Sequence, residues 1–302
     1  MPDATASVLL LGATGQVGHA LRRTLAPLGA VHAPDRPAVD LTDLASVRAA
    51  VRELGPDLVV NAAAYTDVDG AEEEPARAAR INAEAPRVLA EAARAVGAWL
   101  VHYSTDYVFD GTKRAPYTEA DAPSPISVYG RTKRDGEKAI RTVGGRHVIL
   151  RTSWVYSRRR SNFVRTMLRL AGENDRLTVV DDQIGVPTWA GWCAEATASV
   201  CERLLAGDDM PEAGCYHLAG TGQTSWYGLA RAVFAQFGHT DVTVEPVSSG
   251  EYETAAPRPA YTVLDSSRAR AAFDLPAVPW TAQLARFHKR VRTADGERVA
   301  RG

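Results

Sequence analysis

The stretch SVLLLGATGQVG, residues 7–18, decides the fold of this chain. Residues 7–11 form a short apolar run of the length and composition expected for a buried strand. Glycines follow at three-residue intervals, at Gly12, Gly15 and Gly18, and a helical pattern of apolar residues continues beyond them. A strand, a tight turn and a helix in this order are typical of a dinucleotide-binding unit, in which the backbone approaches a pyrophosphate at the helix N-terminus. Because the spacing differs from GxGxxG, a plain strand-to-helix turn is the alternative.

Strands and helices alternate through the rest of the first half of the chain. Buried strands are expected at residues 29–32, 58–61, 99–104 and 147–151. Helices are expected at residues 44–54 and 78–96, and from about Tyr129 onward. This alternation favours an α/β fold, namely a Rossmann-type doubly wound parallel sheet covered by helices on both faces.

The second half mixes helices with short strands and indicates a smaller C-terminal substrate-binding lobe. Its expected helices are residues 162–170, 189–205 and 226–237, and its expected strands are residues 177–180, 215–218 and 242–246. We therefore expect a dinucleotide-binding domain over residues 1–150, with returning segments near 175–187 and 214–240, and a mainly substrate-binding lobe over residues 151–302. A ligand cleft is expected where the two parts meet.

Composition narrows the class of partner. The 302 residues carry a formal net charge of −1, which argues against a nucleic-acid partner because such proteins concentrate positive charge. No apolar stretch approaches the length of a membrane helix, and the N-terminus lacks the pattern of a signal peptide. The three cysteines form no CxxC pair and are expected to be buried, reduced thiols: Cys193, Cys201 and Cys215. We expect a cytoplasmic protein that binds a small molecule.

Charged residues after the second expected strand bear on the choice of cofactor. Asp40 lies near the distance from the glycine turn at which an acidic residue contacts the adenosine ribose. Asp35 is a second acidic candidate, and Arg36 beside it is placed to meet a 2'-phosphate. A solvated loop is the alternative for all three, so the choice between NADH and NADPH stays open.

Tyr129 and Lys133 lie at i and i+4 on an expected helix and therefore on one face. A lysine ammonium near a phenol favours the phenolate, so we expect the pKa of Tyr129 to lie below its ordinary value, which suits a general acid. Thr105 ends the strand before this helix, at the edge where α/β sheets collect ligands. Its hydroxyl is placed to hydrogen-bond a carbonyl oxygen, and a bond to its own backbone is the alternative.

Taken together, six strings resemble the dTDP-4-dehydrorhamnose reductases, a branch of the extended short-chain dehydrogenases. The strings are GATGQVG (12–18), VNAAAYTDVDGAE (60–72), HYSTDYVFDG (102–111), VYGRTKRDGEKA (128–139), RTSWVY (151–156) and DDQIGVPT (181–188). The match runs from about residue 8 to residue 265. The resemblance implies NADPH-dependent reduction of the C4 ketone of a dTDP-4-keto-6-deoxyhexose, with dTDP-4-dehydrorhamnose giving dTDP-rhamnose as the default.

The resemblance also implies residue roles. The catalytic set would be Thr105, Tyr129 and Lys133, with Tyr129 protonating the nascent alkoxide and Lys133 bonding the cofactor ribose. Besides Tyr129 and Lys133, the implied cofactor-binding residues are Gly12, Thr14, Gly15, Gln16, Val17, Gly18, Asp40, Leu41, Ala62, Ala63 and Ala64. Besides Thr105, the implied substrate-binding residues are Asp106, Tyr107, Trp154 and Arg258. Trp154 would cover the apolar face of a deoxysugar, and Arg258 would pair with the diphosphate.

Two departures from the family pattern bear on the substrate pocket and on metal binding. Tyr261 and Thr262 stand where the family usually has Asn and Ser, at the nucleotide end of the pocket. Ala20 stands where metal-binding members carry a Glu at their dimer interface. Alanine offers no oxygen ligand for Mg²⁺, so no metal is expected, and a homodimer is expected only as one option.

Four alternative functions stay open. One is a 4-epimerase, which the catalytic set alone does not exclude, although the family strings disfavour it. A dehydratase usually carries adjacent Asp and Glu after the active-site Thr, whereas Thr105 is followed by Asp106 and Tyr107, so reduction is favoured over elimination. A ketoreductase for another dTDP-deoxyhexose of a secondary-metabolite pathway is compatible with the same catalytic set. A non-catalytic NADP-binding regulatory subunit is compatible with the fold, although the intact catalytic set argues against it.

Overall fold

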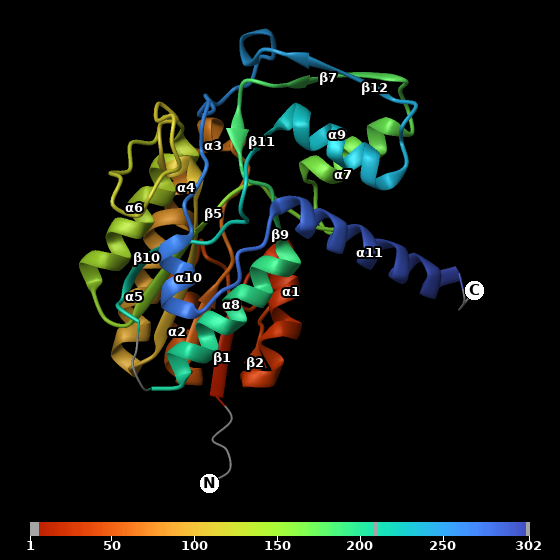
Figure 1. Ribbon diagram of the computed structural model, residues 1–302. Helices are drawn as coiled ribbons and strands as arrows, with labels where there is room; N and C mark the ends of the chain where they lie inside the picture. The colour runs from red at the N-terminus through yellow and green to blue at the C-terminus, as the bar shows by residue number, and fades with distance from the viewer. Residues whose placement is uncertain (1–5, 208–210, 300–302) are drawn as a thin grey trace.

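The computed structural model describes residues 6–207 and 211–299, and its centre is a six-stranded parallel sheet (Figure 1). The strand order is β10-β5-β4-β3-β1-β2. These strands are β1 (Ala6–Leu11), β2 (Gly29–His32), β3 (Leu58–Asn61), β4 (Trp99–Thr105), β5 (His147–Thr152) and β10 (Gly214–His217). The chain leaves β1 for β2 on one side and returns to β3 on the other. The order therefore reverses at β1, and the carboxyl ends of β1 and β3 flank the crevice where such sheets bind ligands. The doubly wound α/β fold is confirmed.

Helices cover both faces of this sheet. One face carries α2 (Leu44–Leu54), α5 (Ala85–Val96) and α6 (Val128–Val143), and the other carries α1 (Gln16–Thr24), α8 (Ala190–Leu205) and α10 (Ser267–Phe273) (Figure 1). The alternation of side chains along β1 explains this arrangement: Val8 and Leu10 belong to one core cluster, and Leu9 and Leu11 to the other. A strand buried on both faces reads as a continuous apolar run, as residues 7–11 do.

The single long helix expected at residues 78–96 is wrong in detail. The chain forms α3 (Gly70–Glu73), α4 (Pro75–Ala79), a π-helical turn (Arg80–Glu84) and then α5. The π turn packs on α6, where a Cβ at Gly136 would lie 2.1 Å from the carbonyl oxygen of Asn82. The close contact needs a glycine, and it places the buried Asn82 side chain beside the candidate site.

The rest of the C-terminal half forms a lobe above the sheet (Figure 1). It contains α7 (Phe163–Ala171), α9 (Trp226–Phe237) and α11 (Trp280–Val299), with the parallel pair β7 (Arg176–Val180) and β12 (Thr243–Val247). Shorter strand pairs join β6 (Val155–Tyr156) to β9 (Thr188–Trp189), and β8 (Ile184–Gly185) to β11 (Thr224–Ser225). Of the two segments expected to return to the dinucleotide-binding part, the one near 175–187 contains β7, which pairs with β12, and the one near 214–240 begins with β10 of the central sheet.

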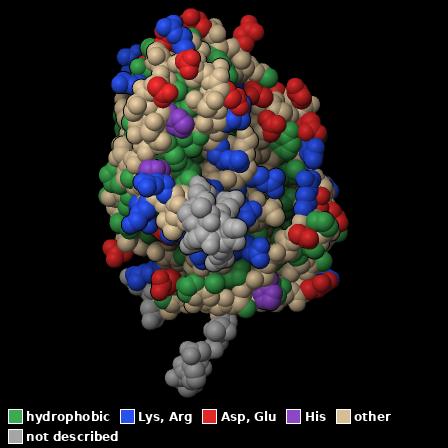
Figure 2. Space-filling model, turned by 90° about the vertical axis from the view of Figure 1, so that its right-hand side faces the viewer, with side chains coloured by type: hydrophobic (Ala, Val, Ile, Leu, Met, Phe, Trp, Pro, Cys, Tyr) green, Lys and Arg blue, Asp and Glu red, His purple; other side chains and the backbone are tan. Residues whose placement is uncertain are grey.

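The three cysteines are buried and unbridged, as expected, and burial raises the pKa of the Cys193 thiol to about 12. The face drawn in Figure 2 carries both signs of charge, with Lys and Arg mainly in its middle and Asp and Glu mostly toward its upper and right-hand edges. Within residues 6–207 and 211–299, no helix is long and apolar enough to cross a membrane.

Candidate functional site

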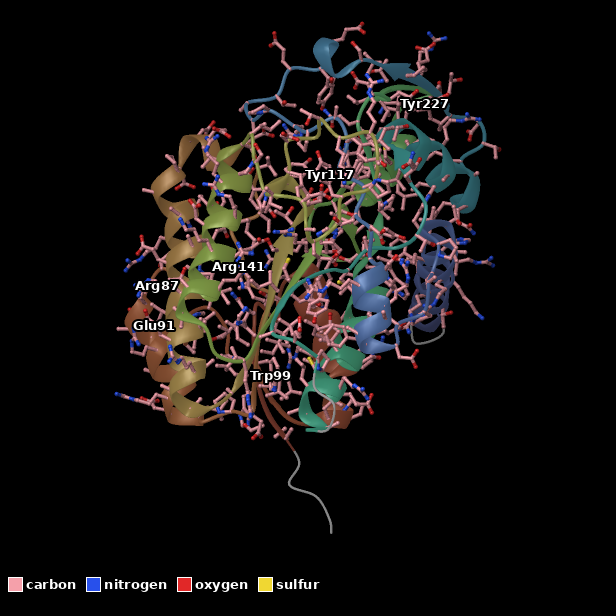
Figure 3. The ribbon with its side chains drawn as sticks, turned by 60° about the vertical axis from the view of Figure 1, so that its left-hand side comes forward. Arg87, Glu91, Trp99, Tyr117, Arg141 and Tyr227 are labelled. Carbon is pink, nitrogen blue, oxygen red and sulfur yellow. The ribbon has the colours of Figure 1, made fainter. Side chains whose placement is uncertain are left out.

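The candidate site lies at the carboxyl ends of the central strands. Figure 3 places Trp99, the first residue of β4, at the lower end of the sheet, and Tyr117 near its upper end, below the lobe. The residues expected to act on substrate follow this upper end of β4. The location agrees with the rule that open α/β sheets bind ligands beyond the carboxyl ends of their strands.

The glycine turn between β1 and α1 brings backbone against backbone. Gly12 has a left-handed φ of 79°, and a Cβ there would lie 2.6 Å from the amide nitrogen of Ala63. A Cβ at Gly18 would lie 2.1 Å from the carbonyl oxygen of Gly12. Gly15 is the N-cap of helix α1 and has no side chain to cap it, so the N–H groups of the first turn have no side-chain acceptor there. This is the cradle that a dinucleotide pyrophosphate requires.

Side chains from the second half of the chain reinforce the turn. Gln16 accepts hydrogen bonds from Ser157 Oγ at 2.9 Å and from Asn162 Nδ2 at 3.0 Å. Arg160 donates to the carbonyl oxygen of Thr14 at 3.3 Å and to its Oγ1 at 3.4 Å. Arg160 therefore brings a cation to the expected phosphate site.

Asp40 and Leu41 follow β2, where the adenosine of a dinucleotide is expected. Asp40 accepts hydrogen bonds from the Thr42 amide at 2.8 Å and from Arg36 Nε at 3.2 Å. The hydrogen bond from the Thr42 backbone is the main reason that the pKa of Asp40 lies below its ordinary value. Leu41 is buried. Arg36 thus lies beside Asp40, where both an acidic and a basic group are available to the ribose end of a dinucleotide.

The loop after β3, with Ala62, Ala63 and Ala64, is held by two buried amides. Asn61 Oδ1 accepts from the Ala63 amide at 3.1 Å. Asn82 accepts from the Tyr65 amide at 2.9 Å, and it donates to the Tyr65 carbonyl at 3.0 Å and to Thr132 Oγ1 at 3.2 Å. This loop, which also contacts Gly12, is therefore fixed to α6.

Thr105 is the last residue of β4 and lies beside Asp106, and both are buried. The Thr105 hydroxyl donates to Asp106 Oδ1 at 3.0 Å and accepts from the Tyr107 amide at 3.2 Å. Asp106 Oδ2 is buried without a hydrogen-bond partner within 3.5 Å. Burial raises the pKa of Asp106 to about 7. The pair therefore holds an acid that changes charge near neutral pH, beside the expected reaction centre.

Tyr129 lies in the first turn of α6, whose N-terminus is capped by the Ser127 side chain. Its ring meets the Tyr107 ring edge-on, with the ring centroids 6.0 Å apart. The expected lowering of its pKa is wrong: burial raises the pKa of Tyr129 to about 12, and a hydrogen bond with the Thr105 hydroxyl only partly opposes the rise. The phenol therefore holds its proton at neutral pH.

Lys133 is fully buried, and its ammonium does not bond the phenol of Tyr129 among the described residues. Nζ donates to the Tyr103 carbonyl at 2.6 Å and lies 3.3 Å from His102 Nε2. Burial lowers the pKa of Lys133 to about 8. Tyr129 and Lys133 both lie on α6, as the i, i+4 spacing predicts, but spacing alone does not show which acceptor the ammonium takes.

Trp154 has a left-handed φ of 43°, which is unusual for a bulky side chain. Its indole stacks on that of Trp226, with ring centroids 3.5 Å apart. A Cβ at Gly185 would lie 2.4 Å from Trp154 Cε2. A ring stacked this closely leaves no room on the same face, so Gly185 lies against the other. Trp226 thus covers one face of the Trp154 ring, and Gly185 lies close to the ring near Cε2.

Arg258 forms a two-pronged ion pair with Asp69 of the β3 loop. Its NH1 and NH2 donate to Asp69 Oδ1 and Oδ2 at 3.1 and 2.6 Å, and the Ala256 amide donates to Oδ1 at 2.9 Å. Nearby, Tyr261 donates its hydroxyl proton to Gln223 at 3.1 Å. The guanidinium expected at the substrate diphosphate therefore ties the C-terminal segment to the sheet domain.

Four residues near the site were not predicted from sequence: Asp69, Asn82, His102 and Trp226. Asp69 lies inside the quoted string 60–72, and its partner is 189 residues away. No signal in the sequence marks Trp226 as the stacking partner of Trp154. Among the described residues, no group of three or more His, Cys, Asp or Glu side chains is arranged to hold a metal ion.

The chain is similar to a known protein family over nearly its whole length. A family model described as the RmlD substrate binding domain matches residues 6–293. The dTDP-4-dehydrorhamnose reductase of Salmonella typhimurium is 44% identical over 284 residues, which cover 91% of this chain and 94% of that protein. A Streptomyces antibioticus protein, described as a probable dTDP-4,6-dihydroxy-2-methyloxan-3-one 4-ketoreductase, is 40% identical and covers 97% of this chain and 98% of its own length.

Solved structures of members of this family share the fold of this chain. The crystal structure of dTDP-4-dehydrorhamnose reductase from Bacillus anthracis, in complex with NADP, has a TM-score of 0.87 to this chain at 36% identity. The alignment covers 95% of this chain and 99% of that one. The chain therefore belongs to the dTDP-4-dehydrorhamnose reductase family.

Proposed function

We propose that this chain reduces the C4 ketone of dTDP-4-dehydrorhamnose to give dTDP-rhamnose, with NADPH as the hydride donor and NADH as the alternative cofactor. One observation carries the proposal: the Thr105 hydroxyl, at the carboxyl end of β4, lies beside the Tyr129 phenol and partly opposes the rise in its pKa. Thr105, Tyr129 and Lys133 are the proposed catalytic residues. The activity named for the Salmonella relative supports the substrate.

The glycine turn fits the proposed cofactor, because neighbouring backbone occupies the space that side chains at Gly12 and Gly18 would need. The proposed dinucleotide ligands are Gly12, Thr14, Gly15, Gln16, Val17, Gly18, Asp40, Leu41, Ala62, Ala63 and Ala64, with Tyr129 and Lys133. The NADP in the Bacillus anthracis structure supports this choice of cofactor. When bound, the reduced nicotinamide supplies the hydride.

Tyr129 supplies the proton that balances the hydride. Ketone, hydride and proton together give the secondary alcohol, so the donor must be protonated before the reaction. A pKa of about 12 keeps the Tyr129 phenol protonated throughout the neutral range. The Thr105 hydroxyl lies against the phenol and orients it toward the oxygen that accepts the proton.

Asp106, Tyr107, Trp154 and Arg258 are the proposed substrate ligands. Asp106 brings a buried carboxyl with an unpartnered oxygen, which suits a sugar hydroxyl. Trp154 is a half-buried indole whose one face is stacked on Trp226. Arg258 is proposed to meet the diphosphate, for which a forked guanidinium is well suited, from the position at which Asp69 now holds it.

A second candidate is a ketoreductase for another dTDP-linked deoxyhexose. The Streptomyces antibioticus relative, at 40% identity, supports it. Tyr261 points to the same option, because it places a bulky phenol where the family usually has a small amide. A non-catalytic NADP-binding subunit is the third candidate, and it makes no use of the Thr105–Tyr129 contact.

A steady-state assay separates these candidates. Purified protein is mixed with NADPH and either dTDP-4-dehydrorhamnose or another dTDP-4-keto-6-deoxyhexose, NADPH oxidation is followed by absorbance, and the product is identified by NMR. Faster turnover of dTDP-4-dehydrorhamnose to dTDP-rhamnose supports the first candidate. Preference for the other sugar supports the second, and NADPH binding without oxidation supports the third.

Three further expectations remain predictions: the division into a dinucleotide-binding domain over residues 1–150 and a sugar-nucleotide-binding lobe over residues 151–302, a homodimer, and a cytoplasmic location. Each follows from sequence reasoning or from the family. Size-exclusion chromatography with light scattering tests the homodimer directly.

A further inference from the structure

His102 is a buried imidazole in the middle of β4 that contacts the proposed catalytic lysine. Only 1% of its surface is exposed. Its Nε2 lies 3.3 Å from Lys133 Nζ, and its Nδ1 lies 3.0 Å from Asn61 Nδ2. Asn61 is the residue directly opposite His102 on the neighbouring strand β3, and it too is buried. The imidazole therefore lies between a fixed amide and the lysine.

Asn61 determines which nitrogen of His102 carries the proton. Its Oδ1 accepts the Ala63 amide hydrogen at 3.1 Å, so its NH₂ group faces His102 Nδ1 and donates to it. A neutral imidazole that accepts at Nδ1 carries its proton on Nε2. Burial, with the nearby Lys133 charge, lowers the pKa of His102 well below its ordinary value, which keeps the ring neutral.

The protonated Nε2 then faces Lys133, and this contact depends on the charge of the lysine. An ammonium carries three donors and no acceptor, so it opposes the Nε2–H group. A neutral amine accepts that hydrogen with its lone pair, and it still donates to the Tyr103 carbonyl at 2.6 Å. Each contact in the series Ala63, Asn61, His102, Lys133 and Tyr103 pairs a donor with an acceptor only when the lysine is neutral.

We propose that His102 is a positioning residue that, held as the Nε2–H tautomer by Asn61, destabilises the Lys133 ammonium so that this lysine exchanges a proton near neutral pH. The inference rests on the proposed function for the catalytic role of Lys133. It adds a role for a residue that never touches substrate, because His102 acts only through the lysine.

The other charged groups around Lys133 act differently. Glu137, one turn along α6, raises the pKa of Lys133, but its carboxylate is bound by Arg151 of β5 at 2.6 Å and by Ser104 Oγ of β4 at 2.6 Å. Asn82 of the π turn carries no charge and is held by Tyr65 and Thr132. Burial lowers the pKa of Lys133 to about 8, in the direction that the His102 contact favours.

The experiment reads the lysine directly. The sequence contains four lysines, Lys113, Lys133, Lys138 and Lys289, so protein labelled with ¹³Cε-lysine gives four resolvable signals, and Lys133→Arg assigns the one of interest. In the wild type this signal is expected to titrate near pH 8. In His102→Gln, the amide can turn its oxygen toward the ammonium, and we expect proton binding about tenfold tighter, a rise of about one pH unit.

His147→Gln is the matched control, because this histidine lies at the other end of the sheet on β5 and bonds Gly145. It should leave the Lys133 titration unchanged. An unchanged midpoint in folded His102→Gln overturns the inference. If that variant does not fold, the wild-type tautomer decides: histidine ¹⁵N spectra showing Nε2–H support the inference, and Nδ1–H or an imidazolium overturns it.

These readouts do not depend on turnover. A chain without reductase activity but with a shifted Lys133 midpoint would contradict the proposed function and leave the inference intact. An active chain in which His102→Gln leaves the Lys133 midpoint unshifted would support the proposed function and overturn the inference.

Discussion

Replacing Glu137 with glutamine should destabilise the protein strongly, because it leaves Arg151 charged inside the core. Glu137 is 0% exposed and Arg151 is 1% exposed. Arg151 Nε and NH2 donate to the two carboxylate oxygens at 2.8 and 2.6 Å, and the Ser104 hydroxyl donates to one of them at 2.6 Å. Removing one partner of such a buried pair costs about 3–5 kcal/mol. This is a large loss, because the free energy of unfolding of a typical domain is only about 5–15 kcal/mol.

Equilibrium urea unfolding at pH 8, followed by tryptophan fluorescence, measures this loss. The control is Glu91→Gln on the neighbouring helix α5, where Glu91 pairs with Arg87 and with Arg48 of α2 on the outer side of the molecule (Figure 3). Exposed pairs contribute only about 0–1 kcal/mol, so this control should unfold almost as the wild type does. The double variant Glu137→Leu with Arg151→Met should recover most of the loss. A Glu137→Gln variant within about 1 kcal/mol of the wild type would contradict the reasoning.

The same pair predicts a pH dependence. Burial tends to raise the pKa of Glu137, but the hydrogen bonds and charge of Arg151 outweigh it, so the pKa lies below its ordinary value of 4.5. The folded state thus binds this proton less readily than the unfolded chain does. The stability that Glu137 contributes is complete above pH 4.5 and is lost as the pH falls through the folded value. The difference in the free energy of unfolding between the wild type and Glu137→Gln should therefore become smaller as the pH falls below 4.5.

Three further changes test the site itself. Tyr129→Phe should lower kcat by about 10²–10⁴-fold, because it removes the proton donor, while the Kd for NADPH measured by fluorescence stays within about threefold; unchanged turnover would refute the assigned acid. Gly12→Ala should prevent NADPH binding or folding, whereas Gly55→Ala, at a φ of 54° with nothing within 4 Å, should cost only about 1 kcal/mol in urea unfolding; equal effects would argue against a packed turn. The free energy of unfolding of the wild type should fall as the pH rises from about 4 to about 7, because burial raises the pKa of Asp106 to about 7 and the folded state keeps a proton that the unfolded chain has lost. Asp106→Asn should abolish this fall. Urea midpoints measured across that range should differ in their pH dependence between the two proteins. The same pH dependence in both would show that the Asp106 carboxyl titrates normally.

The architecture of the sheet was predictable because it depends on local patterns. The apolar run at residues 7–11, the glycine turn and the following helix formed as expected, since burial on both sheet faces and a tight turn each leave a mark in adjacent residues. Thr105, Tyr129 and Lys133 gather at one strand end for the same reason: their position follows from where a strand stops and a helix begins.

Other features depend on contacts between distant residues. The π turn at Arg80–Glu84 has no composition of its own, and it follows from the close approach of Gly136 to Asn82. Spacing put Lys133 near Tyr129, but it did not show that the ammonium bonds Tyr103 and His102, so the expected direction of the Tyr129 pKa was wrong.

Transfer of deuterium from NADPH labelled at C4 of the nicotinamide tests the central claim most directly. Wild-type protein is incubated with dTDP-4-dehydrorhamnose and each of the two stereospecifically labelled cofactors, and the product is examined by NMR. We predict that one of the two cofactors places deuterium at C4 of dTDP-rhamnose and nowhere else in the sugar. Cofactor that stays unoxidised, or deuterium at any other sugar carbon, would contradict a C4 ketone reduced at this site.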